Sequence, residues 1–252
     1  MNIKKYNILG SEISAVKLEK LGLILKKNNY SVTKYICISN VHTVITGRSD
    51  KKLQNATNNS WISLADGKPL SVVGNFFYGK NKFERVTGPG LMKFLINNSK
   101  ELNITHYFYG STKDTIEKLK QKLKDNNYVK GFKDPPFRKF TKNEIKEHFS
   151  IINKTNPKIV WVALGAPKQE KFMLDNLKYL KSGIMIGVGA AFDYYAGNIK
   201  RAPLWMQKMS LEWFFRLIQE PQRLWKRYLI TNTQFMYLAT IELLRHYAKK
   251  LL

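Results

Sequence analysis

Two acidic residues stand out among the 18 in the chain, because each follows an apolar run and adjoins small residues. Asp66, after the run WISLA, could act as a general base that accepts a proton from an attacking hydroxyl. It could equally be a turn residue before Gly67, and the pattern alone favours the turn. Asp193, after GVGAAF, could accept hydrogen bonds from ribose hydroxyls or a base. Its alternative role is to cap a helix.

Two apolar runs in the stretch 158–203 each end at a glycine-rich break. The first, IVWVAL, breaks at GAP, and the second, IMI, breaks at GVG, with a charged helical pattern from Lys168 between them. Two such breaks joined by a helix indicate a βαβ unit. Small residues at strand ends let a ligand approach the backbone, and the following helix N-terminus favours anions. One such turn would be ordinary, but two in succession predict a phosphate or nucleotide site.

Metal chemistry has little support in the sequence. The four histidines are scattered without the spacing of metal ligands, and there is no Asp-x-Asp, Walker lysine motif or nucleophile elbow. Cationic side chains would then have to neutralise any leaving phosphate. Arg85, Lys168 and Arg201 are candidates, each in or beside a loop. Ordinary surface exposure is the alternative for all three.

The formal net charge of +25 over 252 residues is the outstanding feature of the composition. It implies an anionic partner, which could be nucleic acid, an anionic membrane surface or a phosphorylated substrate. A single cysteine, Cys37, suits a reducing cytoplasm. The N-terminus lacks the apolar core of a signal peptide, and no apolar run approaches the ~20 residues that span a bilayer. We therefore expect a soluble protein, or one attached to a membrane from the side.

Apolar runs and amphipathic patterns alternate up to about residue 203, which predicts an α/β fold with a doubly wound, mainly parallel, Rossmann-like sheet. After residue 203 the patterns are helical only. We therefore divide the chain into an α/β domain (1–204) that carries the ligand site and a helical appendage (205–252). The predicted strands are 35–38, 61–64, 106–109, 159–164 and 184–186; the predicted helices include 14–29, 51–59, 115–123, 205–219, 221–228 and 234–252; and 132–140 is a predicted loop.

Five motifs resemble those of the WecG/TagA/CpsF glycosyltransferases and occur in the expected order. They are LADGKPL, DPPFR, LGAPKQEKFM, GVGAAFDYYAGNIKRAPLWMQ and LEWFFRLIQEPQRLWKRYL. The resemblance covers roughly residues 32 to 235. It implies an inverting transfer of a sugar from a UDP-sugar to a polyprenyl-diphosphate-linked saccharide. Members of this family make wall teichoic acid linkage units, enterobacterial common antigen or capsule.

By this resemblance, Asp66 matches the general base, and no metal or other cofactor is expected. The C-terminal helices match an appendage that docks on the anionic inner face of the bacterial cell membrane and closes over the active site. A homo-oligomer stays open. The positions that the resemblance and the strand-end pattern assign to the donor site are Asn40, Arg85, Gly110, Gly165, Pro167, Lys168, Gln169, Gly187, Gly189 and Asp193, and those assigned to the lipid diphosphate are Arg216, Arg223 and Arg227.

Two departures from the family pattern bear on the donor. The family often has Thr-x-Asn where this chain has Ile38-Ser39-Asn40, and often has an acidic residue where Gly90 stands. Ser39 is not expected to replace the missing hydroxyl, because neighbouring strand residues face opposite ways. The donor sugar therefore stays open, and a catalytically inactive scaffold is the main alternative. A nucleic-acid-binding module rests on net charge alone and has no recognised binding motif.

Overall fold

The computed structural model describes residues 3–251, and within them six parallel strands form one sheet in the order β4-β3-β8-β7-β5-β6. The predicted α/β class with a parallel sheet is confirmed. A two-stranded antiparallel pair, β1 and β2, lies beside β4, where the Ser63 backbone N–H donates to Ser14 Oγ. The strands are β1 (Lys5–Ile8), β2 (Ser11–Ser14), β3 (Lys34–Ser39), β4 (Ile62–Ala65), β5 (His106–Gly110), β6 (Val129–Lys133), β7 (Ile159–Ala163) and β8 (Ile184–Gly187).

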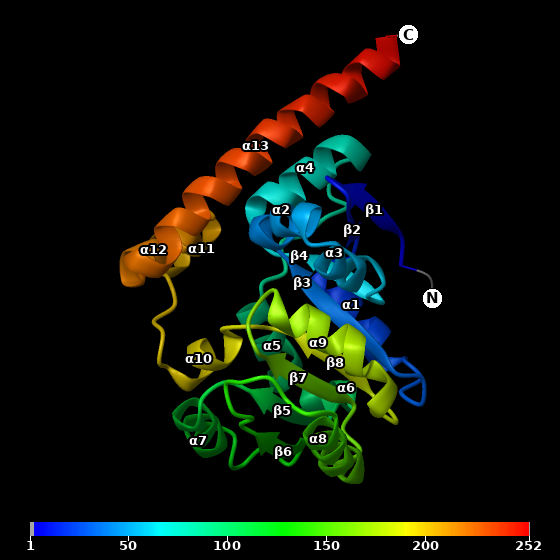
Figure 1. Ribbon diagram of the computed structural model, residues 1–252, viewed down its shortest axis with the longest axis vertical. Coiled ribbons are helices and arrows are strands. Elements are labelled where there is room, and N and C mark those ends of the chain that lie inside the picture. The colour runs from blue at the N-terminus through cyan, green and yellow to red at the C-terminus, as the bar shows by residue number, and fades with distance from the viewer. Residues whose placement is uncertain (1–2, 252) are drawn as a thin grey trace.

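Helices cover both faces of this sheet (Figure 1). The helices are α1 (Leu18–Lys26), α2 (Val41–Ser49), α3 (Lys51–Asn58), α4 (Lys68–Tyr78), α5 (Gly88–Asn97), α6 (Ser99–Leu102), α7 (Lys113–Lys122), α8 (Lys142–Thr155), α9 (Lys168–Asn176), a 3₁₀ turn η1 (Leu177–Tyr179), α10 (Ala191–Ala196), α11 (Leu204–Lys208), α12 (Glu212–Gln219) and α13 (Pro221–Leu251).

The side chains of each strand point alternately to the two faces of the sheet, and each face has its own apolar core. Ile36 and Ile38 of β3 face a cluster formed with α1, α5, α6, α7 and α10. Tyr35 and Cys37 of the same strand face the other cluster, formed with α8 and α9. Consecutive strand residues point to opposite faces, so a sheet buried on both sides needs apolar residues at every position. That requirement explains why the strands read as unbroken apolar runs in the sequence.

Several boundaries differ from the sequence-based prediction. The helix expected over 14–29 begins only at Leu18, because Ser14 belongs to β2 and its hydroxyl is bonded to β4. The loop expected over 132–140 begins inside β6, which pairs with β5 through Phe132. The residues after Asn40, for which no element was predicted, form α2.

The C-terminal segment departs furthest from prediction. The single helix expected over 205–219 is split into α11 and α12 around Ser210, whose φ is +64°. Conversely, the break expected between 228 and 234 is absent, and α13 runs through it without interruption. Thr231 Oγ1 donates to the Arg227 carbonyl at 2.7 Å, and Thr231 is buried, so local bonding and packing outweigh its low helix propensity. Leu252, the predicted last residue of this helix, lies outside the described residues.

The long helix α13 packs against α2 and α4 and then extends away from the sheet (Figure 1). Phe235 and Ala239 of α13 join a third apolar cluster with Val44 of α2 and Leu70 of α4. We call residues 204–251 the appendage and the preceding described residues the body. The appendage therefore lies over the edge of the sheet at which β3 and β4 end.

Candidate active site

The turns after β3 and β4 bring two predicted residues side by side. Asn40 follows β3 and caps α2, with its Oδ1 accepting from the Thr43 N–H at 3.0 Å. Asp66 follows β4, and its backbone N–H donates to the Ser39 carbonyl at 2.7 Å. Gly67 then takes φ +97°, a left-handed conformation that favours glycine, and turns the chain into α4. Asp66 is thus fixed at the carboxyl end of a parallel strand, where such sheets place ligands.

Asp66 lines a cavity of about 550 Å³ between the body and the appendage. Five basic side chains and two carboxylates line it, a local excess of three positive charges. The basic residues are Lys68, Arg85, Arg201, Arg216 and Arg227, and the acidic ones are Asp66 and Glu212. The cavity is therefore suited to an anion even though it contains a candidate base.

The guanidinium of Arg85 is held at the junction of the two regions. Its Nη2 pairs with Glu212 Oε2, and its Nη1 donates to the Gln207 carbonyl at 3.2 Å. Its Nε is buried without a hydrogen-bond partner among the residues that the structure describes, as is Nε of Arg227. Buried donors normally have partners, so two orphaned guanidinium N–H groups beside one cavity indicate a missing acceptor such as a phosphate oxygen.

The surroundings of Asp66 set its acidity. The pKa of Asp66 is raised to about 6, with burial as the largest cause and the positive charge of Arg85 opposing it. Glu212 contributes to the rise, whereas Arg216 and Arg227 act against it. A carboxyl with a pKa of about 6 is mostly ionised at neutral pH and a stronger base than an exposed aspartate, as a general base should be.

The cavity changes character along α13. Arg227 and Tyr228 lie at the charged end, and Leu243 lies sixteen residues further along the helix, about 24 Å at 1.5 Å per residue. Between them the lining includes Phe235 and Ala239, opposite Val72 and Val73 of α4. The cavity thus has one charged end and one apolar wall.

The other predicted donor residues lie at neighbouring strand ends and do not line this cavity. Gly110 ends β5, Gly165 and Pro167 follow β7, and exposed Lys168 begins α9. At Gly110 a Cβ would lie 2.5 Å from the Ala163 carbonyl oxygen, so the close approach of β5 and β7 requires glycine there. These assignments stay predictions.

Gln169 acts on the loop after β8 rather than on the cavity. Its Oε1 accepts from the Gly189 N–H at 2.9 Å, and its Nε2 donates to Glu170 at 2.9 Å. A Cβ on Gly187 would lie 2.8 Å from Met173 and 3.1 Å from Gln169. The glycines of this loop therefore let α9 pack closely against β8.

Two further predicted residues have structural partners outside the cavity. Asp193 accepts from Thr115 Oγ1 at 2.9 Å, which ties α10 to α7. It is not the helix cap considered from the sequence, because Ala190 occupies that position. Arg223 pairs with Glu220 and is mostly exposed, whereas Arg216 and Arg227 do line the cavity.

Sequence reasoning missed several lining residues. Tyr194 lies under the Arg216 guanidinium, with 5.7 Å between its ring centroid and Arg216 Cζ. His42 also lines the cavity, two residues after the predicted Asn40. Burial lowers the pKa of His42 to about 4, and Arg227 lowers it further, so His42 is neutral at pH 7. Glu212 was missed as well, although it stands four residues before Arg216 on the same helical face.

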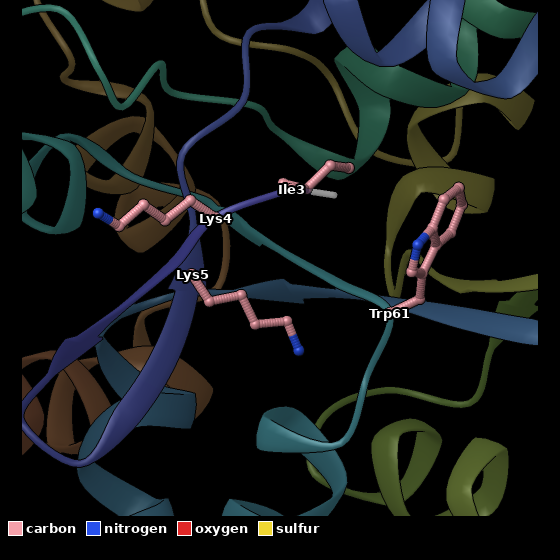
Figure 2. Close-up of a pocket in the computed structure, with 4 residues that line it drawn as sticks. All are labelled: Ile3, Lys4, Lys5 and Trp61. Carbon is pink, nitrogen blue, oxygen red and sulfur yellow. The ribbon is translucent and has the colours of Figure 1, made fainter. Parts of the chain in front are cut away.

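A second hollow, lined by Ile3, Lys4, Lys5 and Trp61, lies by the opposite end of β4 (Figure 2). Lys5 Nζ donates to the backbone carbonyls of Asn58 and Ser60. The lining carries no carboxylate, and its charged groups are two lysines. This hollow therefore has no counterpart of Asp66.

Within the part of the chain that the structure describes, no three His, Cys, Asp or Glu side chains gather as metal ligands do. The same residues include no helix that is both long and apolar enough to cross a bilayer.

Comparison with known proteins agrees with the motifs. The family model described as "Glycosyl transferase WecG/TagA/CpsF family" matches residues 6–249. An N-acetylglucosaminyldiphosphoundecaprenol N-acetyl-beta-D-mannosaminyltransferase of Bacillus subtilis (strain 168) is 36% identical over 151 residues. That match covers 58% of this chain and 56% of the relative, so it spans little more than half of either protein. Because the family model covers nearly the whole chain, this protein belongs to the WecG/TagA/CpsF family of glycosyl transferases.

Proposed function

We propose that this protein transfers a sugar, with inversion, from a UDP-sugar to a saccharide linked to polyprenyl diphosphate, as a step of cell-surface polysaccharide synthesis. The observation that carries the proposal is Asp66, a carboxyl of raised pKa in a cavity ringed by arginines from both regions. The Bacillus subtilis relative, whose name specifies a diphosphoundecaprenol acceptor, supports the same class of substrates.

In this mechanism Asp66 accepts the proton of the acceptor hydroxyl. The hydroxyl oxygen forms a bond to the anomeric carbon while the bond from that carbon to the UDP oxygen breaks. The electron pair of the broken bond leaves with UDP, and a single displacement inverts the anomeric centre. Arg85 lies near enough to Asp66 to lower its pKa, so one cavity offers both a base and a positive charge for the leaving diphosphate. The proposal invokes no metal ion.

Arg216 and Arg227 are the candidates for the acceptor diphosphate, since both line the cavity on the appendage side. The apolar wall along α4 and α13 offers a surface for the lipid next to that charge. Arg223, exposed and paired with Glu220, is better suited to contact lipid headgroups than to bind inside the cavity. In this arrangement the acceptor enters along the appendage.

The outer face of the appendage supports docking on a membrane. Its helices expose large apolar side chains outside the cavity, among them Trp205, Trp225, Met209 and Leu229, whereas exposed Trp213 lines the cavity. Aromatic and basic residues together favour the interface of an anionic bilayer. We propose attachment to the inner face of the cell membrane, where the polyprenyl-linked substrate would be reached from the side.

The donor sugar remains open within the N-acetylhexosamine and hexose classes. Ile38 is buried in the core and brings no hydroxyl to the cavity. The Ser39 hydroxyl is buried and hydrogen-bonded to the Ser63 hydroxyl at 2.9 Å, so it does not replace the missing threonine hydroxyl. A Cβ on Gly90 would lie 4.0 Å from Arg201 Nη2, so an acidic residue at this position would reach the cavity lining. These positions favour testing a panel of donors rather than one.

The test is UDP release with a panel of UDP-sugars and a short-chain lipid-diphosphate acceptor, without added metal. We expect acceptor-dependent release with one donor, and a loss of about 10²–10⁴-fold in turnover for Asp66→Asn with UDP binding retained. Asp114→Asn, an exposed surface carboxylate, is the matched control and should keep full turnover. Unchanged turnover in Asp66→Asn would remove the assigned base. UDP binding without release from any donor would support the inactive scaffold instead.

A further inference from the structure

Glu212 is a carboxylate held between two guanidiniums inside the cavity. Arg85 Nη2 pairs with its Oε2, and Arg201 Nε lies 3.4 Å from its Oε1. The Glu212 side chain is 20% exposed. Both arginines belong to the body, whereas Glu212 is the first residue of α12 in the appendage. The two regions are therefore joined through one anion.

This arrangement resembles the binding of a phosphate. Guanidinium groups bind carboxylate and phosphate oxygens with the same planar donors, so the two anions compete for the same positions. A carboxylate has two oxygens, and here each already faces one arginine. The Arg85 Nε remains buried without a partner, which a diphosphate with more oxygens would be able to satisfy.

Glu212 is also an ionic link between the regions. Across the residues that the structure describes, every ion pair between the body and the appendage passes through its carboxylate. The remaining polar contacts of this junction include the Arg85 bond to the Gln207 carbonyl and the Gln219 bond to the Lys200 carbonyl, at 3.2 Å each. A ligand that captured Arg85 and Arg201 would therefore release α12 from its ion pairs with the body.

We propose that Glu212 occupies the position of the donor diphosphate in the free protein and that the donor diphosphate displaces it. The inference rests on the proposed function, because it takes the ligand of Arg85 and Arg201 to be the diphosphate of a UDP-sugar. Its consequence is a coupling: donor binding and the attachment of α12 to the body compete for the same two guanidiniums. Glu212 is thus a positioning residue that sets both the donor affinity and the closure of the appendage.

The experiment is calorimetric titration of the full-length chain with UDP, inorganic pyrophosphate and uridine. Glu212→Gln keeps the length of the side chain and removes its charge. We expect this variant to bind UDP and pyrophosphate about fivefold more tightly than the parent, the upper scale of one partly exposed ion pair. Uridine, which has no phosphate, should bind with unchanged affinity. Glu117→Gln, an exposed carboxylate of α7, makes the same change in net charge far from the cavity and should change none of the three.

Each other outcome overturns a defined part of the argument. Unchanged or weaker UDP binding by Glu212→Gln would mean that Glu212 does not compete with the diphosphate. An equal gain for uridine would mean that Glu212 merely holds a cover over the cavity. If pyrophosphate binding rises but UDP binds to neither protein, Glu212 is still the internal anion of the site, and the UDP-sugar function fails. Thermal melting of both variants checks that each is folded.

Discussion

In the body, strands β4, β5, β7 and β8 are buried at every position, whereas α12 has no buried residue and α13 buries one face. The buried residues of α13 fall at Leu224, Thr231, Phe235 and Ala239, spacings of seven and four that share one side of a helix. The opposite side carries exposed apolar side chains, among them Leu229, Ile230 and Leu244, and Trp225 is exposed at its flank. The core of the body is thus covered by the body itself. Among the described residues, none covers the outer face of the appendage.

The charges divide in the same way. The body contains the proposed base, Asp66, and the arginine that most strongly opposes the rise of its pKa, Arg85. The appendage supplies Arg216 and Arg227 together with the competing carboxylate, Glu212. The carboxyl and the cations that the proposed mechanism needs therefore meet at the junction of the two regions.

The first prediction compares buried phenylalanines of the two regions. Phe108→Ala removes a ring that stacks on Phe132 and packs edge-on against Phe192 in the body core, so we expect the free energy of unfolding to fall by about 3–5 kcal/mol. Phe235, 1% exposed, packs the appendage on the body. Phe235→Ala should detach α13 locally, with faster amide exchange in α13 while β5 and β7 stay protected. Hydrogen-exchange mass spectrometry checks this, and uniform loss of protection in both variants would contradict it.

The second prediction concerns the outer face of α13. Trp225 is 48% exposed, so Trp225→Ala should change the free energy of unfolding by no more than about 0.5 kcal/mol. The variant should nevertheless bind anionic lipid vesicles about tenfold more weakly, because it loses the apolar area that the tryptophan ring would bury in the membrane interface. Phe137→Ala, which removes a 76% exposed aromatic ring from a body loop, is the control and should bind vesicles like the parent. Equal vesicle binding by all three proteins, measured by flotation, would remove the membrane-docking role of this face.

The body was largely predictable from sequence because its signals are local. Apolar runs marked β3, β4, β5, β7 and β8, and the residues just after them marked the ligand edge. Asn40 and Asp66 were placed there correctly by topology, since parallel strands end at one edge. The outer strand β6 was missed because three of its five residues, VKGFK, are polar or glycine, so it has no apolar run.

The appendage was predicted as helical, but its path could not be derived. Two helices were predicted, over 221–228 and 234–252, and the packing of Thr231 between them makes α13 continuous. The partnership of Glu212 with Arg85 depends on the reversal at Ser210, and no periodic pattern encodes such a reversal. Residues whose roles depend on the docking of two regions are therefore the ones that sequence reasoning missed, as Tyr194 and His42 also illustrate.

The last prediction uses appendage residues to move the pKa of a body residue. Because Asp66 must be deprotonated to accept a proton, kcat/KM should rise with pH through about 6 and then level off. Glu212→Gln removes a negative charge that raises this pKa, so the midpoint should move to lower pH. Arg227→Gln removes a positive charge that lowers it, so the midpoint should move to higher pH.

The free enzyme is the relevant state, since kcat/KM reports its pKa values and Glu212 lies beside Arg85 there. Lys52→Gln, a surface charge paired with Asp175, should leave the midpoint in place. Opposite shifts from Glu212→Gln and Arg227→Gln would show that the appendage closes on the body before the donor binds, and a common midpoint in all variants would show that it does not.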